Sequence, residues 1–235
     1  AASVALCGMS VAFPVGVGLA LVLGVLINYF GAAKGDPLFI FLGVALIAAA
    51  IVMNGLAYRM ARTGKRKLTA KGLLISVAAG TIMAFFYRFV ASSMDLDSFT
   101  APAAGKMTPY TAVVVFATGV FVSNFLFNTI AMKCPVEGTP VRPSEYFGGT
   151  FRTHLVGMLG GAIWCLGESF SMIASGKAGA AISYGLGQGA TLVSALWGIL
   201  IWKEFRGAPG ASVLCNAGMF VLFLAGLGLL IYAGA

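Results

Sequence analysis

Residues Pro109–Met132 read PYTAVVVFATGVFVSNFLFNTIAM, a run of apolar and small polar residues without a single charge. At about 1.5 Å of rise per residue, a helix of this length crosses the roughly 30 Å hydrocarbon core of a bilayer. Strands of a membrane barrel would instead alternate apolar and polar residues over about ten positions, and this run does not alternate. The stretch therefore predicts a transmembrane α-helix.

Six further stretches have the same character. Hydrophobic residues make up 60% of the sequence and charged residues 9%, which is too few charges to cover the surface of a soluble domain. The predicted spans are Val4–Phe30, Pro37–Tyr58, Gly72–Ser92, Pro109–Met132, Leu155–Ala174, Ala178–Trp202 and Gly210–Ala233. The sequence thus predicts an all-α polytopic membrane protein with seven transmembrane helices, surrounded by a lipid bilayer.

The net charge of +8 comes from residues between or at the ends of the spans, so it does not indicate a nucleic-acid partner. Lysine and arginine in short loops mark the cytoplasmic side of a membrane. The basic Arg59–Lys71 loop is therefore predicted to be cytoplasmic, and the C-terminus to lie outside, most simply in a plasma (inner) membrane. Alternation of the spans then leaves four basic residues outside, namely Lys34, Arg88, Lys106 and Lys177.

The few cysteine and histidine residues exclude several classes of site. The four cysteines form no CxxC pair and there is one histidine, so neither a disulfide framework nor a metal centre is predicted. An intramembrane enzyme would need a catalytic cluster, such as paired acids with a histidine or a serine with a base. The sequence offers no such cluster, and we expect neither catalysis nor a cofactor.

The chain contains a faint internal repeat. The stretch GLALVLGVLINYF from Gly18 aligns with LVSALWGILIWKEF from Leu192, so that Gly24 falls on Gly198. The copies lie in the first and sixth predicted spans, five spans apart, and therefore cross the membrane in opposite directions, as inverted repeats of transporters do. Residues 1–70 would end a first repeat (two helices and a cytosolic loop), and residues 71–235 would form a complete second repeat. This repeat predicts a ten-helix (5+5) protein with three helices ahead of Ala1.

Three stretches resemble a known family. The run from Ala174 to Gly207 contains Trp197 and Gly198, followed by Glu204 and Arg206 at the inner helix end. This motif is similar to the penultimate helix of the ureide permease-like branch of the drug/metabolite transporter superfamily. LVLGVLINYF, with Asn28, resembles the fourth helix of that family, and the run from Lys71 to Met94 resembles the helix that opens its second half. Glucose and ribose porters share the last pattern.

Glu168 is the first candidate residue for transport. It lies about 20 Å along its span, too deep for a short acidic side chain to reach either interface. An ionised carboxylate in lipid is costly, so Glu168 must face a cavity or a partner, or be protonated. We therefore expect it to bind a proton or the substrate, with a buried structural carboxyl group as the alternative.

Gln188 is the second candidate, within the glycine-rich run that begins at Tyr184. Glycines such as Gly185 and Gly189 allow close helix packing. Alternatively, the helix is loosened there and offers backbone groups, Gln188 and Tyr184 to a substrate. Gln188 also matches an amide of the resembled family, and its donor and acceptor suit a urea-like ligand.

Further polar and aromatic residues complete the candidate set. Asn124 and Asn128 are four residues apart, so they share one helix face and could line a cavity or bond to another helix. Asn28 could add a polar contact, and Trp164 could stack on a planar ligand or pack in the core. Arg88 could gate the pathway or pair with substrate, or its long stem could reach the outer headgroups.

The resemblance implies proton-coupled uptake of ureides or oxo-heterocycles. We therefore predict a secondary active transporter for a small polar metabolite, coupled to protons (or Na⁺) and working by alternating access. A glucose- or ribose-type sugar porter and a drug/metabolite exporter remain alternatives within the superfamily. A membrane scaffold or channel subunit is the alternative outside it, and a homo-oligomer is left open.

Overall fold

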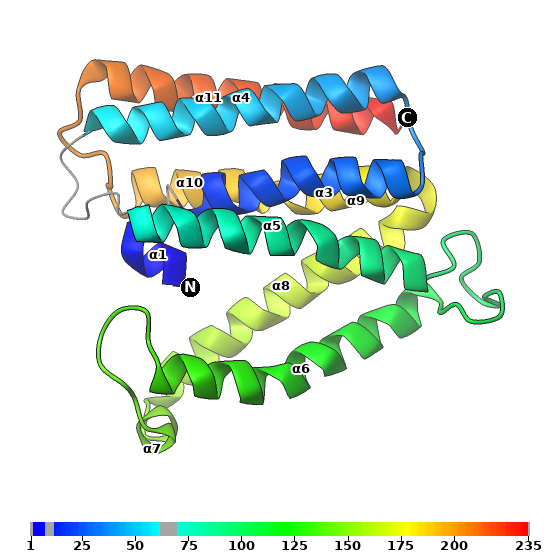
Figure 1. The fold of residues 1–235 in the computed structure, drawn as a ribbon, viewed down its shortest axis with the longest axis horizontal. Helices are drawn as coiled ribbons and strands as arrows, with labels where there is room; N and C mark the ends of the chain where they lie inside the picture. Colours follow the sequence, from blue (N-terminus) through cyan, green and yellow to red (C-terminus); the bar gives the residue numbers. More distant parts are fainter. Residues whose placement is uncertain (1, 8–11, 62–69, 235) are drawn as a thin grey trace.

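The computed structural model describes residues 2–7, 12–61 and 70–234, and its regular elements in these ranges are helices. In chain order they are α1 (Ala2–Cys7), the π-helix η1 (Phe13–Val17), α3 (Gly18–Gly31), α4 (Pro37–Ala61), α5 (Ala70–Ser93), α6 (Pro109–Lys133), α7 (Pro143–Phe147), α8 (Phe151–Ala178), α9 (Ala180–Gly187), α10 (Ala190–Leu200) and α11 (Gly210–Ala233). Figure 1 shows most long helices along one common direction, with α6 and α8 inclined to it.

Five of the seven predicted spans are confirmed as helices that are long and apolar enough to cross a membrane: α4, α5, α6, α8 and α11. Their starts follow ordinary capping chemistry. Thr108 and Thr150 precede α6 and α8, and each hydroxyl oxygen accepts a hydrogen bond from the N–H three residues on, at 3.2 and 3.4 Å. Proline opens α4, α6 and α7, where its missing N–H costs nothing.

The other two predicted spans are not single helices. In place of Val4–Phe30 the structure has α1, η1 and α3, with residues 8–11 outside the described part. In place of Ala178–Trp202 it has α9 and α10, which are separated by a turn at Gln188 and Gly189, and α10 already ends at Leu200. Glycine has low helix propensity, which explains why the glycine-rich segment breaks. The predicted cytoplasmic loop lies mostly in residues 62–69, outside the described part.

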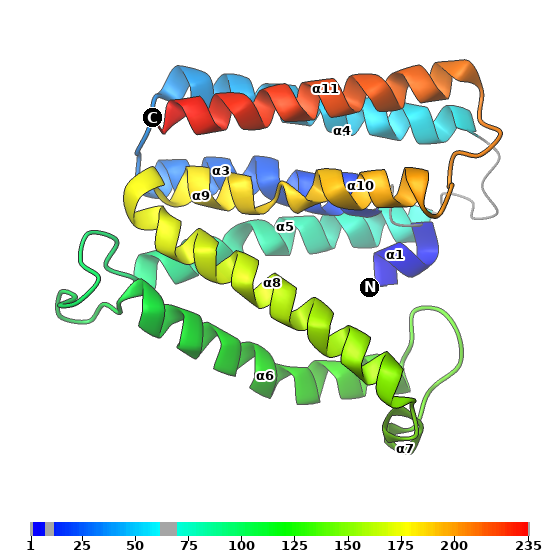
Figure 2. The same ribbon diagram turned by 180° about the vertical axis from the view of Figure 1, so that it is seen from behind.

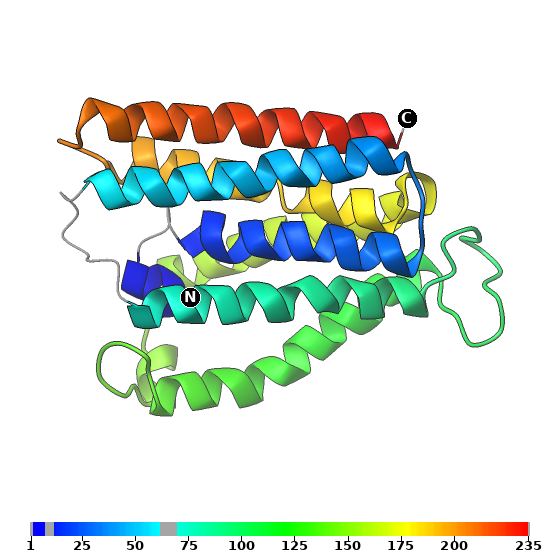
Figure 3. The same cartoon turned by 45° about the horizontal axis from the view of Figure 1, so that its top comes forward.

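Helices α4 and α11 form an antiparallel pair at one edge of the molecule (Figures 1 and 3). The N–H of Asp36, just before α4, donates to the carbonyl of Ala233 at 3.0 Å. At the other end, the Ser212 hydroxyl donates to the carbonyl of Ala57 at 2.7 Å. Between these points the backbones approach closely, because a Cβ on Gly43 would lie 2.8 Å from the Gly226 carbonyl oxygen. Small residues thus set the distance between the two helices.

A second layer contains α3, α5, α9 and α10 (Figure 2). Helix α3 packs against α5 on one side and runs antiparallel to α9. The ring of Tyr184 on α9 fills the space over Gly24 on α3, where any Cβ would overlap it. The Tyr184 hydroxyl also donates to the carbonyl of Ala20 at 3.1 Å. One aromatic side chain therefore holds α3 and α9 together.

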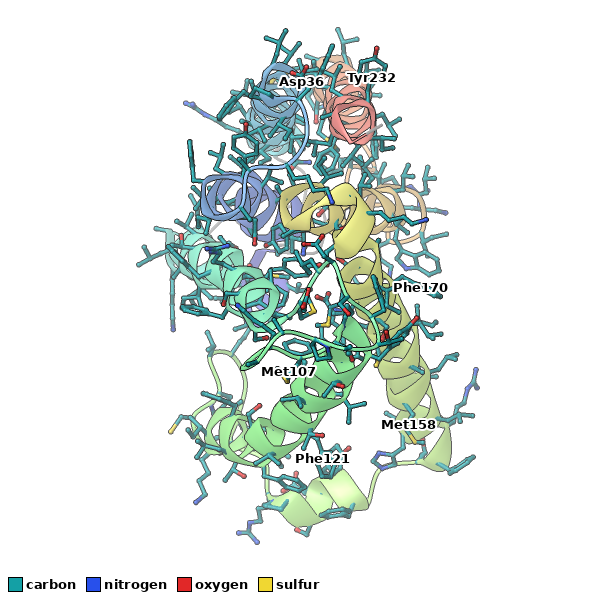
Figure 4. The ribbon with its side chains drawn as sticks, turned by 90° about the vertical axis from the view of Figure 1, so that its right-hand side faces the viewer. Asp36, Met107, Phe121, Met158, Phe170 and Tyr232 are labelled. Atoms are coloured by element: carbon teal, nitrogen blue, oxygen red, sulfur yellow. The ribbon has the colours of Figure 1, made fainter. Side chains whose placement is uncertain are left out.

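The α6–α8 hairpin is the third layer, and it packs on the bundle at one end alone. Pro109 and Ala112 in α6 are buried, as are Ser171, Met172 and Ser175 in α8. No residue of α6 from 113 to 133, and none of α8 from 151 to 170, is buried. Figure 4 shows the layers end-on, from Asp36 and Tyr232 near α4 and α11 to Phe121 and Met158 on the hairpin. The hairpin is thus anchored where α5 and α8 end.

Candidate functional site

A cavity of about 980 Å³ lies between the second layer and the α6–α8 hairpin, next to the anchored end of the hairpin. Most of its lining is apolar. The lining residues are Val17, Ala79, Ile82, Met83, Phe86, Phe116, Gly160, Ile163, Trp164, Gly167, Glu168, Gly187, Gln188 and Ala190. Its volume is at the upper end of the roughly 300–1,000 Å³ that is usual for small-molecule sites.

Two polar side chains face this apolar lining, Glu168 from α8 and Gln188 from the turn between α9 and α10. Glu168 is half-buried, and its Oε1 atom is enclosed without a hydrogen-bond partner among the described residues. Gln188 is 7% exposed. A buried polar atom without a partner is costly unless a ligand, a proton or water satisfies it. The cavity therefore presents unused hydrogen-bonding capacity.

The turn between α9 and α10 positions Gln188. The N–H of Gly189 donates to the Leu186 carbonyl at 2.9 Å, and the N–H of Thr191 donates to the Gln188 carbonyl at 3.0 Å. These bonds span three residues instead of the four of an α-helix, so the backbone tightens locally. The turn also packs closely on α8, because a Cβ on Gly187 would lie 3.3 Å from the Ser171 Oγ atom.

Aromatic rings from three helices form one wall of the cavity. Phe86 on α5 stacks on Phe116 of α6, with ring centroids 5.8 Å apart and planes 26° apart. Phe116 in turn lies 6.1 Å from the ring of Trp164 on α8. Trp164 precedes Glu168 by one helical turn and therefore shares its face. The wall offers flat apolar surface beside a carboxyl group and an amide.

The chain matches a known family over most of its length. Residues 57–233 match the family model described as ureide permease. The chain belongs to the ureide permease family. It is 24% identical to "Ureide permease 2" of Arabidopsis thaliana over 168 residues, which are 71% of this chain and 42% of the relative. It is also 24% identical to "Ureide permease 1" of the same plant over 165 residues, or 70% of this chain and 42% of that relative.

The chain therefore spans about 42% of the length of these curated relatives. No solved structure matches it significantly. Family membership and five apolar helices together make the chain part of an integral membrane protein. Among the described residues, no group of three or more His, Cys, Asp or Glu side chains is placed to hold a metal ion.

The predicted site residues separate into two groups. Glu168, Gln188 and Trp164 come together at the cavity. Tyr184 and Asn28 lie in the core between α3 and α9 instead, and neither lines the cavity. The Tyr184 hydroxyl is bonded to backbone carbonyls, and the Asn28 amide donates to the Gly24 carbonyl at 2.8 Å. In this structure Tyr184 therefore joins α9 to α3, whereas the Asn28 bond lies within α3. A direct substrate contact by either residue stays a prediction.

Three more predicted residues lie away from the cavity lining. Asn128 on α6 donates to the side-chain oxygen of Asn124 at 2.6 Å, and both are exposed. The predicted shared face is thus real, but in this structure the two amides bond to one another. The guanidinium group of Arg88 packs on Gly31 at the end of α3, where a Cβ would overlap it.

The family-motif residues lie at and beyond the end of α10. Trp197 is 51% exposed, whereas Gly198 is buried in the helix. Glu204 and Arg206 follow the helix in a series of turns. The N–H of Glu204 donates to the carbonyl of Gly198 at 3.1 Å and so holds these turns against the helix end. The positive φ of 53° at Lys203 marks the point where the chain turns away. The motif therefore shapes the C-terminal end of α10, whereas Gln188 precedes the N-terminal end of that helix.

Sequence reasoning missed Phe86 and Phe116 of the cavity wall, and the buried hydroxyl groups of Tyr87 and Ser171. Each is an ordinary residue within an apolar span, so nothing in its local pattern distinguishes it from core packing. Tyr87 follows Phe86 directly and is completely buried. Ser171 lies one helical turn after Glu168 on α8 and therefore shares its helix face. This spacing is the one sequence feature that could have placed Ser171 beside the cavity.

Proposed function

We propose that this chain is part of a secondary active transporter for small polar metabolites of the ureide class. The observation that carries the proposal is the cavity of about 980 Å³, in which one carboxyl group and one amide face an apolar lining. The chain's membership of the ureide permease family supports the substrate class. A few polar groups in an otherwise apolar pocket are the usual means of orienting a small ligand.

Glu168 and Gln188 would share the recognition of the substrate. The Gln188 amide can donate through its NH₂ group and accept through its oxygen, and a urea-like edge needs both. An ionised Glu168 would accept from the N–H groups of the ligand, whereas a protonated Glu168 would donate to its carbonyls. Trp164, Phe116 and Phe86 would cover one face of the ligand. This arrangement would favour compact, polar, nitrogen-rich molecules.

Proton coupling would use the same carboxyl group. In the structure the Glu168 Oε1 atom has no protein partner among the described residues, so its proton is not fixed by a permanent hydrogen bond or ion pair. Ionisable groups inside membrane proteins mark proton relays and ion pathways. Glu168 would bind a proton with the substrate and release it on the other side. Na⁺ is the alternative coupling ion.

Alternating access would arise from inverted repeats, with residues 1–70 ending the first and residues 71–235 forming the second. The directions of the helices support this arrangement. Helix α3 runs antiparallel to α9, and α10, the repeat partner of α3, continues in the direction of α9 (Figure 2). The helices that follow the two aligned stretches, α4 and α11, are also antiparallel. Such a protein would have ten helices, belong to the drug/metabolite transporter superfamily, and hold the Arg59–Lys71 loop in the cytoplasm.

Counterflow in proteoliposomes tests the proposal. The full-length protein is reconstituted with unlabelled allantoin inside the vesicles, and labelled allantoin is added outside. We expect transient accumulation of label above the outer concentration, because a carrier exchanges substrates across the membrane. Accumulation of labelled glucose or ribose instead would favour the sugar-porter alternative. Absence of counterflow with ureides, sugars and cationic drugs would contradict a carrier and favour a scaffold or channel subunit.

A further inference from the structure

Three buried hydroxyl-bearing residues join α5, α8 and α9 immediately beside the cavity. The Tyr87 hydroxyl donates to the backbone carbonyl of Ser171 at 3.0 Å. The Ser171 hydroxyl donates to the carbonyl of Ser183 at 3.1 Å and also lies 3.4 Å from the Tyr87 oxygen. Tyr87 is 0%, Ser171 9% and Ser183 3% exposed. The group therefore forms a dry hydrogen-bonded contact between the hairpin and the second layer.

This contact adjoins the residues that line the cavity. Tyr87 follows Phe86 of the aromatic wall, and Ser171 follows Glu168 by three residues on the same helix face. On the other side, the Ser171 Oγ atom packs on Gly187, the residue before Gln188. A shift of Ser171 would therefore move the turn that carries Gln188. The contact is coupled through packing to both polar groups of the cavity.

A further set of contacts closes the same end of the bundle. The ring of Phe99 and the carbonyl of Leu96, both in the loop after α5, pack on Gly176 of α8. The Lys34 ammonium group, after α3, donates to the Gly176 carbonyl at 2.7 Å. Towards the opposite end, α8 has no buried residue from 151 to 170. The bundle is thus closed at one end of the cavity and spread apart at the other.

We propose that Tyr87 and Ser171 form a gate that closes this end of the cavity, and that the gate opens when the Tyr87–Ser171 hydrogen bond breaks. The inference rests on the proposed alternating access and adds which contact must separate. Ser171 is a positioning residue: it acts on the substrate through Gly187 and Gln188. Polar groups that part must find water or new partners, so the gate would exchange between two discrete arrangements instead of deforming gradually.

Cysteine accessibility tests the gate in the full-length protein. Cys7, Cys134, Cys165 and Cys215 are replaced by alanine, and Ser175, which is completely buried one turn beyond Ser171, becomes the reporter through Ser175→Cys. The rate of its reaction with a small water-soluble thiol reagent is measured in detergent. We expect slow reaction in the parent and about fivefold faster reaction in Tyr87→Phe, since one net hydrogen bond is lost from the closed state.

The matched control is Tyr110→Phe, which removes an exposed hydroxyl at the same end of the hairpin and should leave the rate unchanged. Rapid reaction of the parent, or equal rates in the parent and in Tyr87→Phe, would overturn the gate. Should Tyr87→Phe elute as aggregate, Ser171→Ala gives the second test. It keeps the Tyr87 bond to the Ser171 carbonyl but loses the two bonds of the Ser171 hydroxyl, to Ser183 and to the Tyr87 oxygen. Because the lost bond to Tyr87 is the longer of the two gate contacts, we expect a smaller increase than fivefold, and no increase would overturn the gate.

A ligand response separates gating from general loosening of the fold. Saturating allantoin should change the reactivity of the reporter in the parent, and Ser171→Ala should reduce that change, because Ser171 links Gln188 to the gate. An equal response in both proteins would contradict the positioning role. The accessibility assay needs no transport. Normal counterflow with an unchanged reporter rate would therefore refute the gate alone, whereas a faster rate without counterflow would refute the transport function.

Discussion

Glu168 on α8 and Gln188 between α9 and α10 line the same cavity from two helical segments that the chain connects through a single glycine, Gly179. Gly179 has a φ of 84°, a left-handed conformation that glycine adopts without strain. It ends α8 and lets α9 return beside α3. The carboxyl group and the amide are therefore brought together by one sharp reversal of the chain.

Loss of the Gln188 amide should weaken ureide binding. Gln188→Leu keeps approximately the side-chain volume but removes both the donor and the acceptor, so the polar edge of the ligand would be left unpaired. We expect the affinity for the ligand to fall by at least about tenfold. The measurement is the concentration of unlabelled allantoin that halves counterflow. Thr118→Val, on the exposed face of α6, is the control, and equal half-inhibitory concentrations for Gln188→Leu and the parent would remove Gln188 from the site.

The α4–α11 pair should be sensitive to a single methyl group at Gly43. In Gly43→Ala the new Cβ would lie 2.8 Å from the Gly226 carbonyl oxygen, so the backbones must separate. Overpacking of this kind costs about 1–3 kcal/mol. We expect a lower thermal unfolding temperature in detergent. Gly55→Ala on the same helix meets nothing within 4 Å and should be neutral or slightly stabilising; a similar loss for both variants would contradict close packing at Gly43.

The loop after α5 should lose its order in strong acid. Backbone N–H groups of Ala103, Asp97 and Ser98 donate to the Asp95 carboxylate and hold its pKa below the usual 3.8. A lowered pKa means that the ionised form stabilises the loop. This contribution is fully present above pH 3.8 and disappears as the pH falls through the lower value. Hydrogen exchange of these three amides against pH measures it. Asp95→Ala should show weak, pH-independent protection, and protection lost near neutral pH in the parent would contradict this explanation.

The sequence predicted the five long helices well, because lipid imposes length and composition on each span independently of its neighbours. It also pointed to Glu168 and Gln188, since isolated polar groups within apolar runs are conspicuous. It did not predict that α9 and α10 separate, although the glycines of that segment made this one of two alternatives.

The remaining parts of the site depend on which helices meet. Phe86, Phe116 and Trp164 belong to three helices, and their wall exists because the α6–α8 hairpin packs on α5 at one end. The position of the Tyr184 ring likewise depends on a distant residue, because Gly24 on α3 makes room for the ring in the core. No local pattern encodes such pairings between distant residues.

The central claim, that Glu168 carries the coupled proton, is tested most directly by uptake driven by a pH gradient. Labelled allantoin uptake into proteoliposomes is compared for the full-length parent and Glu168→Gln, with an inward proton gradient and without one. We expect the gradient to stimulate uptake in the parent and to have no effect in Glu168→Gln, while that variant elutes and unfolds like the parent. Undiminished gradient-driven uptake by Glu168→Gln would contradict the claim.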